Sequence, residues 1–213
     1  MLHLQSFTFN PFQENTYLLY NDQQECWIID PGMYGPDEEK ILFDFIDEKQ
    51  LKPQQIINTH AHIDHILGIA ALQSTFRIPL GIHQQEQVIL DNAKNSALMF
   101  GLHLTQVPKV DFYIEEGKLL QLGADQLQVR LAPGHSPGSI LFYSAQGKWV
   151  ISGDVLFQGS IGRSDLPGGD HETLLQSIRR QLYTLPNDTY VYSGHGGVTS
   201  IEVEKQSNPF VQA

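Results

Sequence analysis

The sequence has little cysteine and little positive charge. Its single cysteine, Cys26, cannot form a disulfide within the chain, which is typical of a protein kept in a reducing cytoplasm. The 13 Lys and Arg residues against 24 Asp and Glu residues give a net charge of -11, which disfavours nucleic acid and anionic membranes as partners. No apolar run can span a bilayer, and the start MLHLQSFTFN lacks the pattern of a signal peptide. We therefore expect a cytoplasmic protein that binds neither nucleic acid nor a membrane.

The sequence also lacks the usual signs of a nucleophilic side chain. It contains no G-x-S-x-G elbow, which argues against a serine hydrolase of that type. Cys26 lies in an ordinary strand pattern, and isolated cysteines of this kind are mostly buried and inert. We therefore assign Cys26 to packing and look for a nucleophile that is not a side chain.

The remaining sequence is typical of a folded α/β protein. Hydrophobic residues make up 41% of it, and no linker divides it, so we expect one domain over residues 1–213. Aromatic and β-branched runs predict strands at 2–9, 15–21, 25–30, 54–60, 78–83, 118–122, 127–135, 139–145, 148–157 and 189–197. Apolar periodicity and composition predict helices starting at Pro36 and over 66–76, 84–100, 171–185 and 201–206. This order fits an α/β (α+β) fold of two packed mixed sheets with helices outside.

The stretch THAHIDHILG, residues 59–68, crowds metal-binding side chains at the end of a predicted strand. It contains His60, His62, Asp64 and His65. Imidazole and carboxylate are preferred ligands of zinc and are also used by iron and manganese. His60 and His62 would point the same way in an extended segment, whereas Asp64 and His65 follow a turn. Four donors at one strand end can serve two adjacent ions.

Three further donors follow three later predicted strands. His135 lies in LAPGHSPGSI, Asp154 in VISGDVLF and His195 in VYSGHGG. Each stands beside glycine, which lets the backbone turn sharply and an ion approach closely. Together with the first stretch, these loops predict a metal site built from strand-end loops.

These motifs resemble a known family. The set HAHIDH, PGHSPGS, SGDVLF and SGHGG looks like the metallo-β-lactamase superfamily, in the short form of its glyoxalase II-like branch. The segments ENTYLL, IIDPG and GSIGRSDLPGGD resemble the same branch, so the likeness covers nearly the whole chain. It implies an αββα sandwich with the metals at one edge between the two sheets.

The resemblance also implies a ligand set for two divalent ions. His60, His62 and His135 would hold the first ion; Asp64, His65 and His195 would hold the second; Asp154 would bridge both. A carboxylate can span two ions about 3.5–4 Å apart. Zinc is the metal we expect first, with iron or manganese as alternatives.

The activity implied by the resemblance is hydrolysis of a small thioester of the hydroxyacylglutathione type, such as S-D-lactoylglutathione. A hydroxide bridging two ions would attack the carbonyl carbon, because a zinc site lowers the pKa of bound water to roughly 7. A thiolate leaves easily, since the pKa of a free thiol is about 8.5. We expect Asp154 and Asp64 to be the catalytic carboxylates, with Asp64 also steering the hydroxide proton.

Two other residues are candidates for supporting roles. Asp30 in IIDPG would either accept an N–H from a metal-bound histidine or simply form the turn before Pro31. Arg163 in GRSD would either orient substrate or, with Asp165, tie down its loop. The residues leave both pairs of alternatives open.

Three other functions compete with thioester hydrolysis. A related persulfide dioxygenase with one iron would use His60, His135 and Asp154 alone. A lactone or β-lactam hydrolase would use the same scaffold. A binding protein without activity would keep the fold and a bound metal without turnover.

Overall fold

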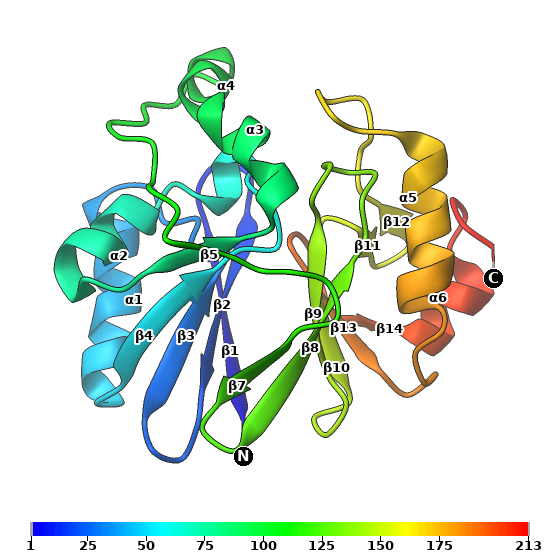
Figure 1. Ribbon diagram of the computed structural model, residues 1–213, viewed down its shortest axis with the longest axis horizontal. Helices are drawn as coiled ribbons and strands as arrows, with labels where there is room; N and C mark the ends of the chain where they lie inside the picture. The colour runs from blue at the N-terminus through cyan, green and yellow to red at the C-terminus, as the bar shows by residue number, and fades with distance from the viewer. Residues whose placement is uncertain (1, 213) are drawn as a thin grey trace.

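The computed structural model describes residues 2–212. Two six-stranded sheets pack face to face, and helices cover the outer face of each sheet. In the view of Figure 1, α1 (Pro36–Glu48) and α2 (Ile69–Phe76) cover the left-hand sheet. On the other side, α5 (His171–Ser177) and α6 (Ile201–Ser207) cover the right-hand sheet. The αββα sandwich expected from the sequence is confirmed.

The first sheet has the order β1-β2-β3-β4-β5-β6. Its first three strands are antiparallel neighbours, and from β3 to β6 the pairing is parallel. The strands are β1 (His3–Phe9), β2 (Glu14–Tyr20), β3 (Glu25–Ile29), β4 (Lys52–Ile57), β5 (Leu80–Ile82) and β6 (Phe112–Tyr113).

The second sheet has the order β14-β13-β10-β9-β8-β7 and is antiparallel except where β10 meets β13. A two-stranded ribbon of β11 (Leu156–Phe157) and β12 (Ser160–Ile161) follows β10. The strands of the sheet are β7 (Leu119–Leu122), β8 (Asp125–Leu131), β9 (Ile140–Ser144), β10 (Trp149–Gly153), β13 (Tyr190–Ser193) and β14 (Thr199–Ser200).

Successive side chains of each strand point to opposite faces of its sheet, and this alternation divides the core into three layers. On β2, Tyr17 and Leu19 point between the sheets, whereas Leu18 packs against the helices outside. On β9, Phe142 points inward and Leu141 outward in the same way. Because both faces of each sheet are covered, these strands are apolar almost throughout, as expected of strands at the centre of a layered fold.

Two predicted elements differ from those observed. The helix predicted over 84–100 is three short segments, namely a 3₁₀ turn η2 (Gln84–Glu86), α3 (Gln87–Asp91) and α4 (Ala93–Met99). It is interrupted at Asn92, whose side-chain amide donates to the Val88 carbonyl. The strand predicted after Pro53 contains this residue, because a bulge beside Cys26 shifts the register there.

Two predicted helices also have different bounds. The helix predicted over 66–76 begins only at Ile69, after the 3₁₀ turn η1 (Ile63–His65). The helix predicted over 171–185 changes from α5 to a π-helical segment, η3 (Ile178–Leu182). Asp170 caps its start, as its Oδ1 accepts from the Thr173 amide. Over residues 2–212, no helix has the length and apolar character needed to cross a membrane.

Candidate metal centre

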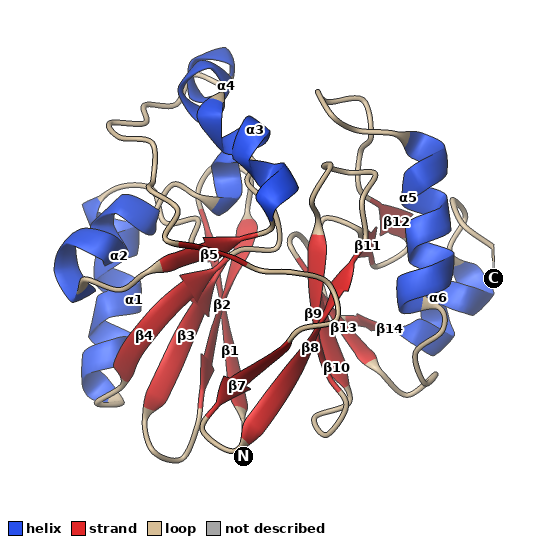
Figure 2. Cartoon of the chain, viewed as in Figure 1, coloured by secondary structure: helices blue, strands red, loops and turns tan. Residues whose placement is uncertain are grey.

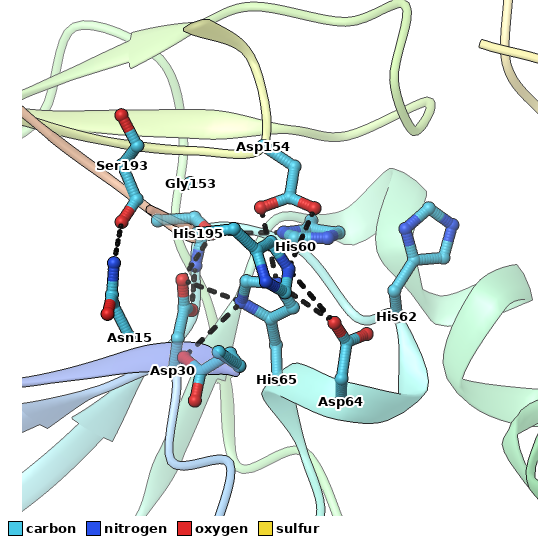
Figure 3. A network of polar contacts seen from close by, with 12 residues as sticks. Asn15, Asp30, His60, His62, Asp64, His65, Gly153, Asp154, Ser193 and His195 are labelled. Atoms are coloured by element: carbon cyan, nitrogen blue, oxygen red, sulfur yellow. Dashed lines mark hydrogen bonds and ion pairs between the residues drawn. The ribbon is translucent and has the colours of Figure 1, made fainter. Parts of the chain in front are cut away.

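The predicted donor residues come together at one edge of the sandwich, where five strands end. β3 and β4 are parallel, and β8, β10 and β13 also run in one direction, since β9 is antiparallel to both β8 and β10. Within each sheet the loops that follow these strands therefore lie at one edge, and contacts such as those of His65 with Asp154 and of His60 with His135 join the two edges. They carry Asp30, the segment 60–65, His135, Asp154 and His195, most of which Figure 3 shows converging on one point.

The first group of donors consists of three imidazoles. Nε2 of His135 lies 2.8 Å from Nδ1 of His62 and 3.2 Å from Nε2 of His60. Two ligand atoms on a tetrahedral zinc ion lie about 3.4 Å apart, given zinc–nitrogen bonds of about 2.1 Å. The three nitrogens are thus close enough together to hold one ion.

The second group lies beside the first. Oδ2 of Asp64 is 3.1 Å from Nε2 of His195 and 3.7 Å from Nε2 of His65. His65 is fully buried, and its Nε2 has no hydrogen-bond partner among the described residues. A buried nitrogen without a partner is costly, so this geometry favours a ligand such as a cation between these atoms.

Asp154 lies between the two groups. Its Oδ1 is 3.3 Å from Nε2 of His65, and its Oδ2 is 3.4 Å from Nε2 of His195 and 3.6 Å from Nε2 of His135. Oδ1 is another buried atom without a hydrogen-bond partner in the described structure. The carboxylate is thus placed to contact an ion in either group.

Backbone carbonyls fix the tautomers of two histidines. Nδ1 of His135 lies 2.7 Å from the Arg163 carbonyl oxygen, and Nδ1 of His195 lies 3.0 Å from that of Phe12. A carbonyl can only accept, so each Nδ1 carries a proton, and each Nε2 is the nitrogen that would bind an ion at the centre. The Arg163 side chain instead forms a bidentate pair with Asp165.

Asp30 orients two further histidines. Its Oδ2 lies 3.2 Å from Nδ1 of His65, an ion-pair contact without hydrogen-bond geometry, and also accepts the Thr59 hydroxyl at 2.5 Å. The oxygen of Thr59 is in turn 3.0 Å from Nδ1 of His60, and since its hydrogen is already donated, it accepts the proton of that ring. Of the two readings left open by the sequence, this geometry favours support of the histidines.

Burial keeps the first group neutral. Desolvation lowers the pKa of His60, His62 and His135, in the case of His62 to about 3. Nearby imidazoles lower it further, because a second positive charge would be repelled. Neutral imidazole is the form that binds metal, so this group is ready for an ion at neutral pH.

The second group is charged. Burial alone would lower the pKa of His65 and His195, but the carboxylates of Asp154 and Asp64 outweigh it and raise both, that of His195 to about 10. Burial would likewise raise the pKa of the two carboxylates, but the His65 charge and the hydrogen bond from His195 together outweigh it and lower both. Without a metal, protons therefore occupy the place that a cation would take.

Sequence reasoning missed two buried glutamates near the centre. Glu86 accepts from the Ala61 and Gly138 amides and from the Ser136 hydroxyl, so it joins the loop of the first motif to that of His135. Glu14 is fully buried, with Oε1 3.7 Å from Nδ1 of His65. Glu14 is the first residue of the apolar strand ENTYLLY, and this position could have indicated that it is buried. Glu86 lies in the polar run HQQEQ, whose composition indicates an exposed segment.

A cavity of about 570 Å³ adjoins the centre. His62, Asp64 and His195 form part of its wall, and the rest comes from α3, α4 and the loops near Phe12 and Arg163. A space of this size accommodates a small organic molecule beside the donor groups. The arrangement therefore combines a candidate binuclear metal site with a substrate cavity.

The chain is similar to proteins of known sequence. The chain is 44% identical over 203 residues to "Probable metallo-hydrolase YqgX" of Bacillus subtilis, covering 94% of this chain and 93% of that protein. It is 36% identical over 209 residues to "Hydroxyacylglutathione hydrolase GloC" of Haemophilus influenzae, covering 95% and 94%.

Solved structures agree with the fold and the family. The crystal structure of BLEG-1 B3 metallo-beta-lactamase matches with a TM-score of 0.90 and 40% identity, covering 99% of this chain and 100% of that one. TTHA1623, crystallised in a di-iron-bound form, matches with a TM-score of 0.88 and 37% identity, covering 97% and 100%. The profile of the metallo-beta-lactamase superfamily matches residues 9–195. The chain is thus a member of the metallo-beta-lactamase superfamily.

Proposed function

We propose that this protein is a binuclear metal-dependent hydrolase that cleaves thioesters of small hydroxy acids. The observation that carries the proposal is the position of Asp154 between two complete donor groups. His60, His62 and His135 would hold one ion, and Asp64, His65 and His195 the other. Bound divalent ions would supply a hydroxide near neutral pH and stabilise negative charge on the substrate oxygen.

The residues around the ions have separate tasks. Asp154 would hold both ions at a fixed separation. Asp64, whose Oδ2 faces His195 and which lines the cavity, would accept the proton of the nucleophile as well as bind metal. The carbonyls of Phe12 and Arg163 hold the rings of His195 and His135 so that each Nε2 would face a bound ion.

A thioester fits this site better than an amide does. A thiolate departs without protonation, since the pKa of a thiol is about 8.5, whereas an amine must be protonated as it leaves. Among the residues that line the cavity, Arg163 is the one cation outside the donor groups, and it is held by Asp165. The resemblance to GloC of Haemophilus influenzae supports the same substrate class.

The test is hydrolysis of S-D-lactoylglutathione by metal-loaded protein, with a chelator-treated sample in parallel. We expect thiol release that the chelator abolishes and that zinc, iron or manganese restores. If protein carrying two ions per chain releases no thiol from any lactoyl thioester, thioester hydrolysis is wrong.

A second candidate is hydrolysis of a β-lactam, because a protein named as a B3 metallo-beta-lactamase is 40% identical to this chain. The same preparation is therefore assayed with a chromogenic cephalosporin.

Metal analysis tests the one-iron persulfide dioxygenase, which would leave Asp64, His65 and His195 without an ion. One iron per chain in the purified protein would favour that oxidation over hydrolysis.

A further inference from the structure

The cavity beside the metal centre has a mainly apolar wall. Val88 of α3 and Met99 of α4 line it although they are 56% and 82% exposed. Phe12, Ile89, Phe100 and Leu166 add further apolar surface. Large apolar side chains gathered around an open cavity are a common mark of a binding site for an apolar group.

The same wall has little to offer an anionic ligand. Arg163 is the one lysine or arginine among the described residues that line the cavity. Its Nε and one terminal nitrogen lie 2.7 and 2.8 Å from the two carboxylate oxygens of Asp165, so a ligand carboxylate would have to compete with this pair. The polar groups of α4 in the wall, Asn95 and Ser96, are neutral.

One aromatic residue connects the apolar wall to the metal centre. The Phe12 ring packs edge to face against Phe100, with ring centroids 5.4 Å apart. The Phe12 carbonyl oxygen faces Nδ1 of His195. The end of the cavity that adjoins the donor groups is thus fixed in place, and a substrate lying along the wall would place its reacting end beside His195.

We propose that this cavity binds an uncharged, mainly apolar group on the thiol side of the substrate, and that it discriminates against glutathione. The inference rests on the proposed thioester hydrolysis. A hydroxyacyl group as small as lactoyl sits at the ions, so the thiol portion is the part that fills the cavity. Glutathione carries two carboxylates, for which the wall has no unpaired cation.

The test compares lactoyl thioesters of three thiols. N-acetylcysteamine and N-hexanoylcysteamine have the same thiol chemistry and no charge, and differ by four methylene groups; glutathione is the third. A buried methylene favours binding by about fourfold, so with partial burial we expect kcat/KM for the hexanoyl compound to exceed that for the acetyl compound by roughly tenfold or more. We expect the hexanoyl compound to exceed S-D-lactoylglutathione by a similar factor.

Substitutions of wall residues test whether the wall causes the preference for the hexanoyl compound. Val88→Ser and, separately, Met99→Ser should each lower the hexanoyl-to-acetyl ratio at least threefold. Both residues are more than half exposed, so neither change should unfold the protein. Leu98→Ser is the matched control, because Leu98 is also on α4 and 72% exposed but does not line the cavity. Its ratio should stay that of the unaltered protein.

The outcomes separate this inference from the function on which it rests. Equal kcat/KM for the two cysteamine compounds, or a preference for S-D-lactoylglutathione, would overturn the apolar cavity and leave thioester hydrolysis intact. No release of thiol from any of the three by protein with two bound ions would overturn the function itself.

Discussion

Oδ2 of Asp30 faces one histidine of each donor group, His65 directly at 3.2 Å and His60 through the hydroxyl of Thr59. The chain adopts a left-handed conformation at Asp30, with φ 50°, which brings its carboxylate under both rings. A buried carboxylate behind two histidines increases their basicity toward an ion on the other side. Asp30 is therefore a positioning residue for both halves of the centre.

Replacing Asp30 by Asn should weaken metal binding about 10–100-fold, as is typical when the partner of a metal-bound histidine is lost. Asn has the same shape and tolerates the left-handed conformation, so the fold should persist. Zinc affinity is measured by competition with a chelating indicator. Asp44→Asn, at an exposed pair with Lys40, is the control and should bind zinc normally. Unchanged affinity in Asp30→Asn would remove its positioning role.

Asp64→Asn should reduce the metal content from two ions per chain to one. The amide keeps the size of the carboxylate but removes the charge that faces His195 and His65. We expect kcat for thioester hydrolysis to fall at least 100-fold, since this site both holds an ion and activates the nucleophile. Metal analysis after gel filtration gives the stoichiometry. A variant with two ions and full activity would rule out both roles of Asp64.

The two donor groups should load metal with different pH dependence. The pKa of His62 is about 3, and burial lowers the pKa of His60 and His135 as well, so protons compete little for the first group near neutral pH. The pKa of His195 is about 10, so an ion entering the second group must displace a proton at any lower pH. Because the pKa of His65 is raised as well, affinity for the second ion should rise at least tenfold per pH unit between about pH 6 and pH 8, and affinity for the first should change far less. An equal slope for both ions in zinc titrations would contradict this.

The sequence indicated the layered fold and the donor residues because both leave local patterns. Buried strands are apolar runs, and histidines crowded into THAHIDHILG have few structural uses. The same patterns could not show which nitrogen of each ring faces the ions. That depends on backbone carbonyls such as those of Phe12 and Arg163, which any residue type can supply.

The limits of prediction are also clear in the segment 84–100. Its composition is typical of one helix, but the structure has three short helical segments there. In this arrangement the Glu86 side chain points inward to the loop of Ala61, and Val88 lines the cavity. The role of Glu86 depends on residues more than 20 positions away in sequence, such as Ala61 and Ser136. A single sequence contains no signal for such contacts, since local propensity is the same whichever face is buried.

Gly194→Ala should abolish binding of at least one ion. A Cβ at Gly194 would lie 2.1 Å from Oδ1 of Asp154 and 2.8 Å from Cε1 of His65, so the bridging carboxylate would have to move. Gly197→Ala is a control on the same loop, because its Cβ would meet only the end of the flexible Gln158 side chain. Metal content of the two variants gives the answer. Two ions in Gly194→Ala would show that Asp154 need not lie where the structure has it.

Glu86→Gln should destabilise the fold and loosen the metal centre together. Burial raises the pKa of Glu86, and three donors from the loops of Ala61, Ser136 and Gly138 converge on its carboxylate. The amide nitrogen of Gln would face one of these donors, which leaves a buried group unpaired at a cost of about 1–3 kcal/mol. Urea unfolding of metal-free protein measures that cost, and zinc competition should show weaker binding of the first ion. Gln85→Glu, an exposed change next to it, should alter neither. Lower stability with normal zinc affinity would restrict Glu86 to a role in folding alone.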